Sequence, residues 1–186
     1  SPGNGVRSSL SNRHQELHTD NSYNLPPDYV ALLCLHPAKE GGVSGIVSFQ
    51  TAHDRLLETR PDLLERLYQP FCFDRQSEHA PDDPNTVNRV PVFAYDGDQL
   101  RTRYAISLVR GGHEIAGEPL DDAGREAMEA LNSIIEEPAM RRDFDFQAGQ
   151  IQIVDNRRIG HRRTGFDDWP EADRKRHLVR LWVRNQ

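Results

Sequence analysis

Alternating and continuous apolar positions predict strands over much of the chain. Residues 29–35, YVALLCL, form an apolar run between LPPD and HPAKEGG, which is typical of a buried strand between two turns. Residues 44–49, SGIVSF, predict the next strand. Between residues 87 and 109, β-branched and aromatic residues on both sides of DGDQ predict a hairpin, and a loop is expected over residues 110–122.

Helical spacing occurs in two places. Leucines at positions 56, 57, 63, 64 and 67 predict two short helices joined near Arg60, because Pro61 suits the first turn of a second helix. Apolar residues at 123, 127, 128, 131, 134 and 135 predict a longer helix, which Asp121 or Asp122 caps and which Pro138 ends.

Alternation returns near the C-terminus, over residues 144–156 with a turn at Ala148-Gly149 and over residues 174–185. Several strands with helical inserts predict a mainly β protein with a barrel or jelly-roll core. We expect a flexible N-terminal arm at residues 1–14 and one domain at residues 15–186, with a helical insert around 50–147. A chain of 186 residues suits one core.

The amino-acid composition limits the kinds of molecule that the protein is expected to bind. The net charge is −6 and the pI about 5.7, whereas nucleic acids and anionic membranes call for basic surfaces. No apolar run reaches the ~18 residues of a membrane span. Cys34 and Cys72 both lie in apolar runs, where a thiol usually behaves as a core residue. We therefore expect a soluble, cytoplasmic protein that binds a small molecule and not nucleic acid or membrane.

His18 and Asp20 are two residues apart in the segment QELHTDNSYN. In an extended strand both side chains point to one face, about 6.6 Å apart along the chain, and can converge on one cation. With a second imidazole they make the 2-His-1-carboxylate set that suits Fe(II). The best third ligand is His161 in DNRRIGHRRTGF, because it follows a predicted strand. His-x-Asp also occurs by chance, so an ordinary pair of polar residues is the alternative.

Two arginines on the last strand change this balance. Arg176 and Arg180 share a face with Leu178 and Trp182. If both faces of this strand are covered, the two guanidinium groups are buried and require anionic partners. Arginine matches a carboxylate bidentately, so the barrel interior can bind a dicarboxylate whose other end chelates the metal. A solvated edge strand, or pairing with acidic side chains of the protein, is the alternative.

Together these segments resemble the Fe(II)- and 2-oxoglutarate-dependent dioxygenases of the TauD/TfdA type, which include clavaminate synthase-like proteins. The matching segments are HTD at 18–20, GGVS at 41–44, DNRRIGH at 155–161 and RHLVR at 176–180. The resemblance runs from about Leu17 to Val183 and implies a double-stranded β-helix, a cupin-like jelly roll. Family members carry a longer segment before His-x-Asp, so we expect either that the N-terminal portion of the fold is missing from this chain or that the protein is unusually short.

The resemblance assigns roles to individual residues. His18, Asp20 and His161 would be the catalytic iron ligands, and Arg176 with Ser44 would bind 2-oxoglutarate. Arg180 would meet an anionic group of the primary substrate or pair internally. Asn21 and Tyr23 would line the substrate site or merely stabilise a turn. The candidate site therefore comprises His18, Asp20, Asn21, Tyr23, Ser44, His161, Arg176 and Arg180.

The activity implied by the resemblance is a non-heme Fe(II)- and 2-oxoglutarate-dependent oxygenase. It would use O₂ to hydroxylate or desaturate a C–H bond of a small carboxylate-bearing substrate, such as an amino acid or betaine, and release succinate and CO₂. Two alternatives stay open: a truncated, non-catalytic barrel that binds a small acid, and a Zn or Mn cupin-like enzyme that does not use 2-oxoglutarate. A homo-oligomer is one expectation for its assembly.

Overall fold

Two antiparallel sheets form the β part of the molecule. The computed structural model describes residues 11–185. The larger sheet has the order β1-β11-β4-β9, and its strands are Gln15–His18 (β1), Ile159–Arg163 (β11), Ser44–Ser48 (β4) and Arg141–Phe144 (β9). The smaller sheet has the order β10-β2-β13, and its strands are Ile151–Asp155 (β10), Tyr29–His36 (β2) and His177–Val183 (β13). This arrangement confirms the mainly β fold class with helical inserts.

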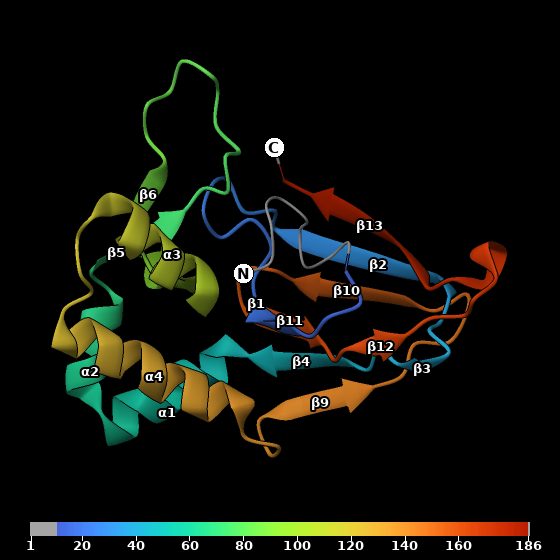
Figure 1. Ribbon diagram of the computed structural model, residues 1–186. Coiled ribbons are helices and arrows are strands. Elements are labelled where there is room, and N and C mark those ends of the chain that lie inside the picture. The colour runs from blue at the N-terminus through green and yellow to red at the C-terminus, as the bar shows by residue number, and fades with distance from the viewer. Residues whose placement is uncertain (1–10, 186) are drawn as a thin grey trace.

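The helices gather at one end of the two sheets (Figure 1). They are Phe49–Thr59 (α1), Pro61–Leu67 (α2), Ile106–Ala116 (α3) and Asp122–Glu136 (α4). Ser48 caps α1 through its side chain, and Asp121 caps α4 by accepting a hydrogen bond from the backbone N–H of Gly124. The two short helices and the long one are therefore confirmed, with the break at Arg60 as expected.

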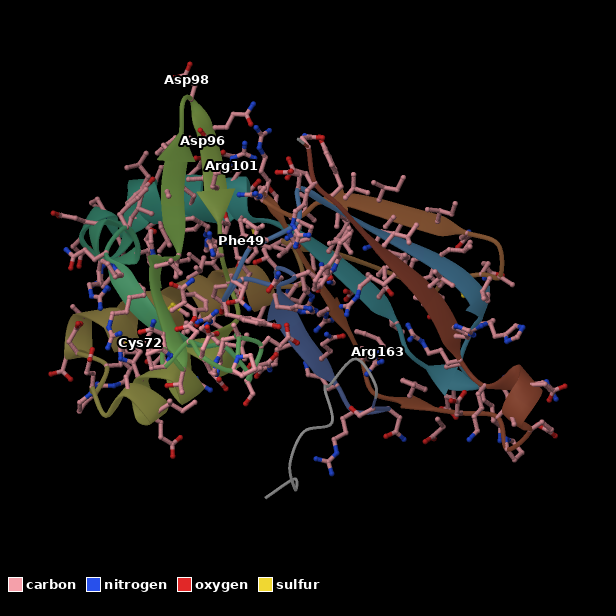
Figure 2. The ribbon with its side chains drawn as sticks, turned by 90° about the horizontal axis from the view of Figure 1, so that it is seen from above. Phe49, Cys72, Asp96, Asp98, Arg101 and Arg163 are labelled. Atoms are coloured by element: carbon pink, nitrogen blue, oxygen red, sulfur yellow. The ribbon has the colours of Figure 1, made fainter. Side chains whose placement is uncertain are left out.

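Small two-stranded ladders complete the fold. Their strands are Pro70–Asp74 (β5) with Val87–Pro91 (β6), Phe93–Asp96 (β7) with Gln99–Thr102 (β8), and Glu40–Gly41 (β3) with Phe166–Asp167 (β12). The β7–β8 hairpin extends away from the helices, with Asp96 and Asp98 at its tip (Figure 2). A short 3-10 helix at Ala172–Arg174 precedes β13.

A hydrophobic core joins the helices to the larger sheet. Its large, fully buried side chains include Phe49, Phe71, Phe93, Tyr104 and Leu131. The Phe49 and Tyr104 rings lie 5.2 Å apart between their centroids. Because Phe49 directly follows β4, this packing fixes the end of the strand next to β11 and so positions the strand that carries His161.

The prediction for residues 103–117 was wrong. The second arm of the hairpin ends at Thr102, and residues expected to be strand and loop form helix α3. Tertiary packing explains the difference: Gly112 lies so close to β5 that an added Cβ would come within 2.2 Å of the Cys72 carbonyl oxygen. The packing of this segment against β5 outweighs the preference of the apolar residues in ISLV for a strand.

The boundaries of the insert and of the arm also differ from expectation. The chain returns to the larger sheet at Arg141, so β9 begins within the expected insert around 50–147. Residues 1–10 of the expected arm lie outside the described part. Of the rest, Ser11 and Arg13 accept hydrogen bonds from the Arg163 side chain through their carbonyl oxygens. Residues 11–14 are thus attached to β11 rather than belonging to a free arm.

The smaller sheet has an apolar, exposed outer face, so the condition that both faces of the last strand are covered is not met. Alternate residues of its three strands point outward, and Ile153 and Leu181 flank Ala31 at 68% and 61% exposure. The large apolar residues on this face are Tyr29, Leu35, Ile151, Ile153, Val179, Leu181 and Val183. Within residues 11–185, no helix combines the length and apolar character that crossing a membrane requires.

Candidate active site

Three side chains from two distant segments converge at one point of the larger sheet. One potential ligand atom from each of His18, Asp20 and His161 lies within 4.8 Å of the other two. The Oδ1 atom of Asp20 lies 3.3 Å from Nε2 of His18 and 3.4 Å from Nε2 of His161. The sequence-based set of candidate ligands is thus brought together in space.

Strand pairing places the two imidazoles side by side. His18 is the last residue of β1 and is paired with His161 in the centre of β11, with ring centroids 4.4 Å apart. Asp20 differs from expectation, because the strand ends at His18 and Asp20 lies in a turn. Thr19 holds this turn by donating its backbone N–H to the Tyr104 carbonyl at 2.8 Å. The convergence therefore depends on the turn and not on period-2 strand geometry.

Asn156 holds the backbone of Asp20 from the other side. This asparagine is fully buried, and its Oδ1 accepts the Asp20 backbone N–H at 2.7 Å. Its Nδ2 donates to the carbonyl oxygens of Asp20 and Pro27 at 3.0 and 3.1 Å. The turn that carries the carboxylate is thereby fixed to the segment just before β11.

The protonation states suit a cation site. Burial alone would raise the pKa of the Asp20 carboxyl, but hydrogen bonds with His161 and His18 outweigh it and hold the pKa well below its usual range. Burial, aided by the imidazole of His18, lowers the pKa of His161. An ionised carboxylate between two imidazoles is the ligand set that suits Fe(II) or a similar divalent ion. The residues present therefore fit the iron that the family resemblance implies.

A cavity of about 720 Å³ opens beside His161. Ser44, Arg176 and Arg180 also line it, so the expected cosubstrate residues share one space with a candidate metal ligand. Burial lowers the pKa of the Arg176 guanidinium, which lies 5.2 Å from the Phe166 ring centroid. The charge of the Asp168 carboxylate, which lines the same cavity, partly offsets this shift. A partly buried cation of this kind favours an anionic ligand.

A second cavity, of about 360 Å³, lies beside His18 and Asp20. His18, Asp20 and Trp182 line it, and so do Asn21 and Tyr23. The side chains of Asn21 and Tyr23 also have structural partners: Asn21 donates to the Leu25 carbonyl at 2.7 Å, and the Tyr23 hydroxyl donates to Glu78 at 2.7 Å. The expected turn role and the expected position in the substrate site are thus compatible.

Arg180 lies between the two cavities and lines both. Its Nη1 atom is 3.3 and 3.2 Å from the two carboxylate oxygens of Asp20. Of the two roles expected from sequence, internal pairing is the one present here, with a candidate metal ligand as the partner. The same guanidinium still faces both cavities.

Sequence reasoning missed three residues of this site. Asn156 and Trp182 both contact Asp20, and the Gln15 amide nitrogen lies 3.2 Å from Nε2 of His18. Asn156 could have been identified from the sequence, since it precedes His161 in the segment DNRRIGH at residues 155–161. Trp182 and Gln15 are identified only by their spatial contacts.

The fold and the site together define a jelly-roll protein with a 2-His-1-carboxylate centre. Comparison with known families agrees: the model described as "Taurine catabolism dioxygenase TauD, TfdA family" matches residues 1–182. The chain belongs to this family.

The relatives are longer proteins. FR-33289 synthase of Streptomyces rubellomurinus is 30% identical over 181 residues, which are 96% of this chain and 52% of the relative. Clavaminate synthase 2 of Streptomyces clavuligerus is 29% identical over 184 residues, covering 96% and 53%. A solved asparagine oxygenase in complex with Fe(II), 3-hydroxyasparagine and succinate has a TM-score of 0.72 at 21% identity, covering 95% and 52%. The chain spans about half the length of these relatives, and the structural likeness confirms the fold.

Proposed function

We propose that this chain carries the iron centre of a 2-oxoglutarate-dependent oxygenase acting on a small carboxylate-bearing substrate, such as an amino acid or betaine. The observation that carries the proposal is the convergence of His18, Asp20 and His161 within 4.8 Å, beside a cavity that contains Arg176. The expected reaction consumes O₂ and 2-oxoglutarate, releases succinate and CO₂, and hydroxylates or desaturates an unactivated C–H bond of the substrate.

Fe(II) bound by the three side chains would supply the oxidising chemistry with O₂ and the keto acid. The protein residues hold the ion in place. The Asp20 carboxylate gives the ligand set one negative charge, which attracts a divalent cation. The Arg180 guanidinium pairs with this carboxylate and would share it with the ion. The three protein ligands leave room for small-molecule ligands on the remaining side.

Arg176 and Ser44 are the residues that would bind 2-oxoglutarate. They line the same cavity as His161, so a dicarboxylate could reach the metal with one end and the guanidinium with the other. Arginine offers a planar pair of donors to a carboxylate, and Ser44, which is 5% exposed, can add a hydroxyl. We expect Arg176→Gln to weaken 2-oxoglutarate binding 10- to 100-fold while Fe(II) binding is retained.

The primary substrate would enter the smaller cavity. Arg180 reaches this cavity from β13, and Asn21 and Tyr23 line its wall. A guanidinium that already faces the Asp20 carboxylate can also attract an anionic group of a substrate. The asparagine oxygenase with 3-hydroxyasparagine supports an amino acid as the substrate class.

The test uses the protein with Fe(II), 2-oxoglutarate and a panel of amino acids and betaines, with succinate and CO₂ as products. Wild-type protein and His79→Ala, which changes a partly exposed loop histidine that lines neither cavity, are expected to behave alike. His161→Ala is expected to lose iron and all product formation. Iron-dependent turnover that survives His161→Ala would overturn the triad.

The same experiment separates the alternatives. Calorimetric binding of 2-oxoglutarate with no turnover across the panel would identify a non-catalytic barrel. Zinc or manganese in protein purified without added iron, together with 2-oxoglutarate binding that is absent in both wild type and Arg176→Gln, would identify a cupin-like enzyme of another chemistry. A homo-oligomer and a cytoplasmic location stay predictions.

A further inference from the structure

The two oxygens of the Asp20 carboxylate have different surroundings. Oδ1 lies near Nε2 of both His18 and His161, at 3.3 and 3.4 Å. Oδ2 accepts a hydrogen bond from the indole N–H of Trp182 at 2.7 Å. The indole therefore occupies the oxygen that is turned away from the two imidazoles.

We propose that Trp182 is a positioning residue of the metal centre, which fixes the rotation of the Asp20 carboxylate and leaves Oδ1 as the oxygen that binds the ion. The inference rests on the metal site of the proposed function. A carboxylate without such a partner can rotate or bind an ion through both oxygens. A neutral N–H donor on Oδ2 removes this freedom, and it adds no further positive charge to those of the ion and of Arg180.

Arg180 cannot supply this selectivity. Its Nη1 atom lies 3.3 and 3.2 Å from Oδ1 and Oδ2 of Asp20, so it interacts with both oxygens almost equally. The indole of Trp182 has one donor and reaches one oxygen. Arg180 thus balances the charge of the carboxylate, whereas Trp182 determines its orientation.

The strand that carries Trp182 is suited to this task. Trp182 is paired with Val30 of the central strand β2, and the Val30 side chain is fully buried. The Trp182 side chain points inward, on the face opposite Leu181 and Val183. The guanidinium of Arg180 lies 5.2 Å from the Trp182 ring centroid and packs against it. These contacts hold the indole on a rigid element, which positions a ligand more reproducibly than a loop does.

The first test compares Trp182→Phe with Trp169→Phe, which changes the chain's other tryptophan. Trp169 packs under Arg174, with the guanidinium carbon 3.6 Å from the ring centroid, and lines neither cavity among the described residues. Anaerobic calorimetry with Fe(II) is expected to show a 10- to 100-fold larger dissociation constant for Trp182→Phe. This is the range typical when a hydrogen-bond partner of a metal ligand is lost. Trp169→Phe is expected to stay within about twofold of wild type.

The visible absorption spectrum of bound Co(II) is the second readout, because it responds to the number of carboxylate oxygens on the metal and not to stability alone. We expect the spectrum of Trp182→Phe to differ from those of wild type and Trp169→Phe. Identical Co(II) spectra and Fe(II) affinities in folded Trp182→Phe and wild type would overturn the role of Trp182 alone. Wild-type protein that binds no Fe(II) would overturn the metal site and this inference with it.

A third measurement needs no change at position 182. In Trp169→Phe protein, a single indole N–H resonance remains, and it belongs to Trp182. Its hydrogen bond to a carboxylate predicts a downfield shift that is lost when Asp20→Ala is added. A resonance that does not move on this addition would contradict the hydrogen bond and the proposal, even if Trp182→Phe fails to fold.

Discussion

Replacing Asn156 with alanine should destabilise the fold more than any comparable change of a polar side chain on the surface. The Asn156 side chain is fully buried and makes three hydrogen bonds, two to the Asp20 backbone and one to the Pro27 carbonyl. Alanine removes all three and leaves the Asp20 N–H and the two carbonyl groups without these partners in a buried turn.

The magnitude follows from these three bonds. Each contributes about 1 kcal/mol net, and a buried group left without a partner costs about 1–3 kcal/mol instead. The free energy of unfolding should therefore fall by about 3–5 kcal/mol in Asn156→Ala. Since domains have only about 5–15 kcal/mol in total, this loss removes a large share of the stability.

Urea denaturation followed by circular dichroism measures this loss. The matched control is Asn88→Ala, because Asn88 makes one side-chain hydrogen bond, to the Tyr23 carbonyl at 2.9 Å, and is only partly buried. Its expected cost is about 1 kcal/mol. If Asn156→Ala costs no more than Asn88→Ala, the three bonds do not hold the Asp20 turn, and the reasoning is refuted.

Three further predictions concern regions outside the site. Gly112→Ala should lower the free energy of unfolding by about 1–3 kcal/mol through overpacking against β5, whereas Gly111→Ala, whose added Cβ has 3.7 Å of clearance, should raise it by about 0.5–1 kcal/mol in urea denaturation. Hydrogen bonding to Arg75 lowers the pKa of Asp83 to about 2, so its stabilising effect is present above pH 3.8 and is lost as the pH falls toward 2; a carboxyl resonance titrating near 3.8 would contradict the pair. Ile153→Lys should change stability by less than about 0.5 kcal/mol, because the side chain is 68% exposed, and should reduce binding of a hydrophobic dye.

Several strands of the two sheets were predictable because their patterns are local, whereas β9 and β11 were not predicted. The run YVALLCL becomes β2, and the alternation at 177–183 becomes β13, although only one face of that strand is covered. Helix α3 was not predictable from its own residues. ISLV has the composition of a strand, and the following Gly111-Gly112 pair favours a loop, but close contact with β5 requires a small residue at position 112 and accommodates a helix there.

The candidate site divides in the same way. His18 and Asp20 lie two residues apart, so the sequence alone indicates a pair of metal ligands. His161 was predicted as the third ligand because it comes after the predicted strand that became β10. The residues that hold Asp20 come from far along the chain: Asn156 is 136 residues away and Trp182 is 162 residues away. No local pattern encodes such a contact. The sequence indicated that Arg180 pairs either with a substrate or with an acidic group of the protein. The structure identifies Asp20 as the acidic partner.

The position of Asp20 links the stability of the fold to the chemistry of the site. Its backbone is held by Asn156 before β11, and its side chain by Trp182 and Arg180 on β13. The smaller sheet therefore holds a ligand whose two partners, His18 and His161, belong to the larger sheet. A change that separates the sheets must also move the carboxylate away from the imidazoles. Because an ion bound by all three side chains opposes that separation, metal affinity and fold stability should rise and fall together.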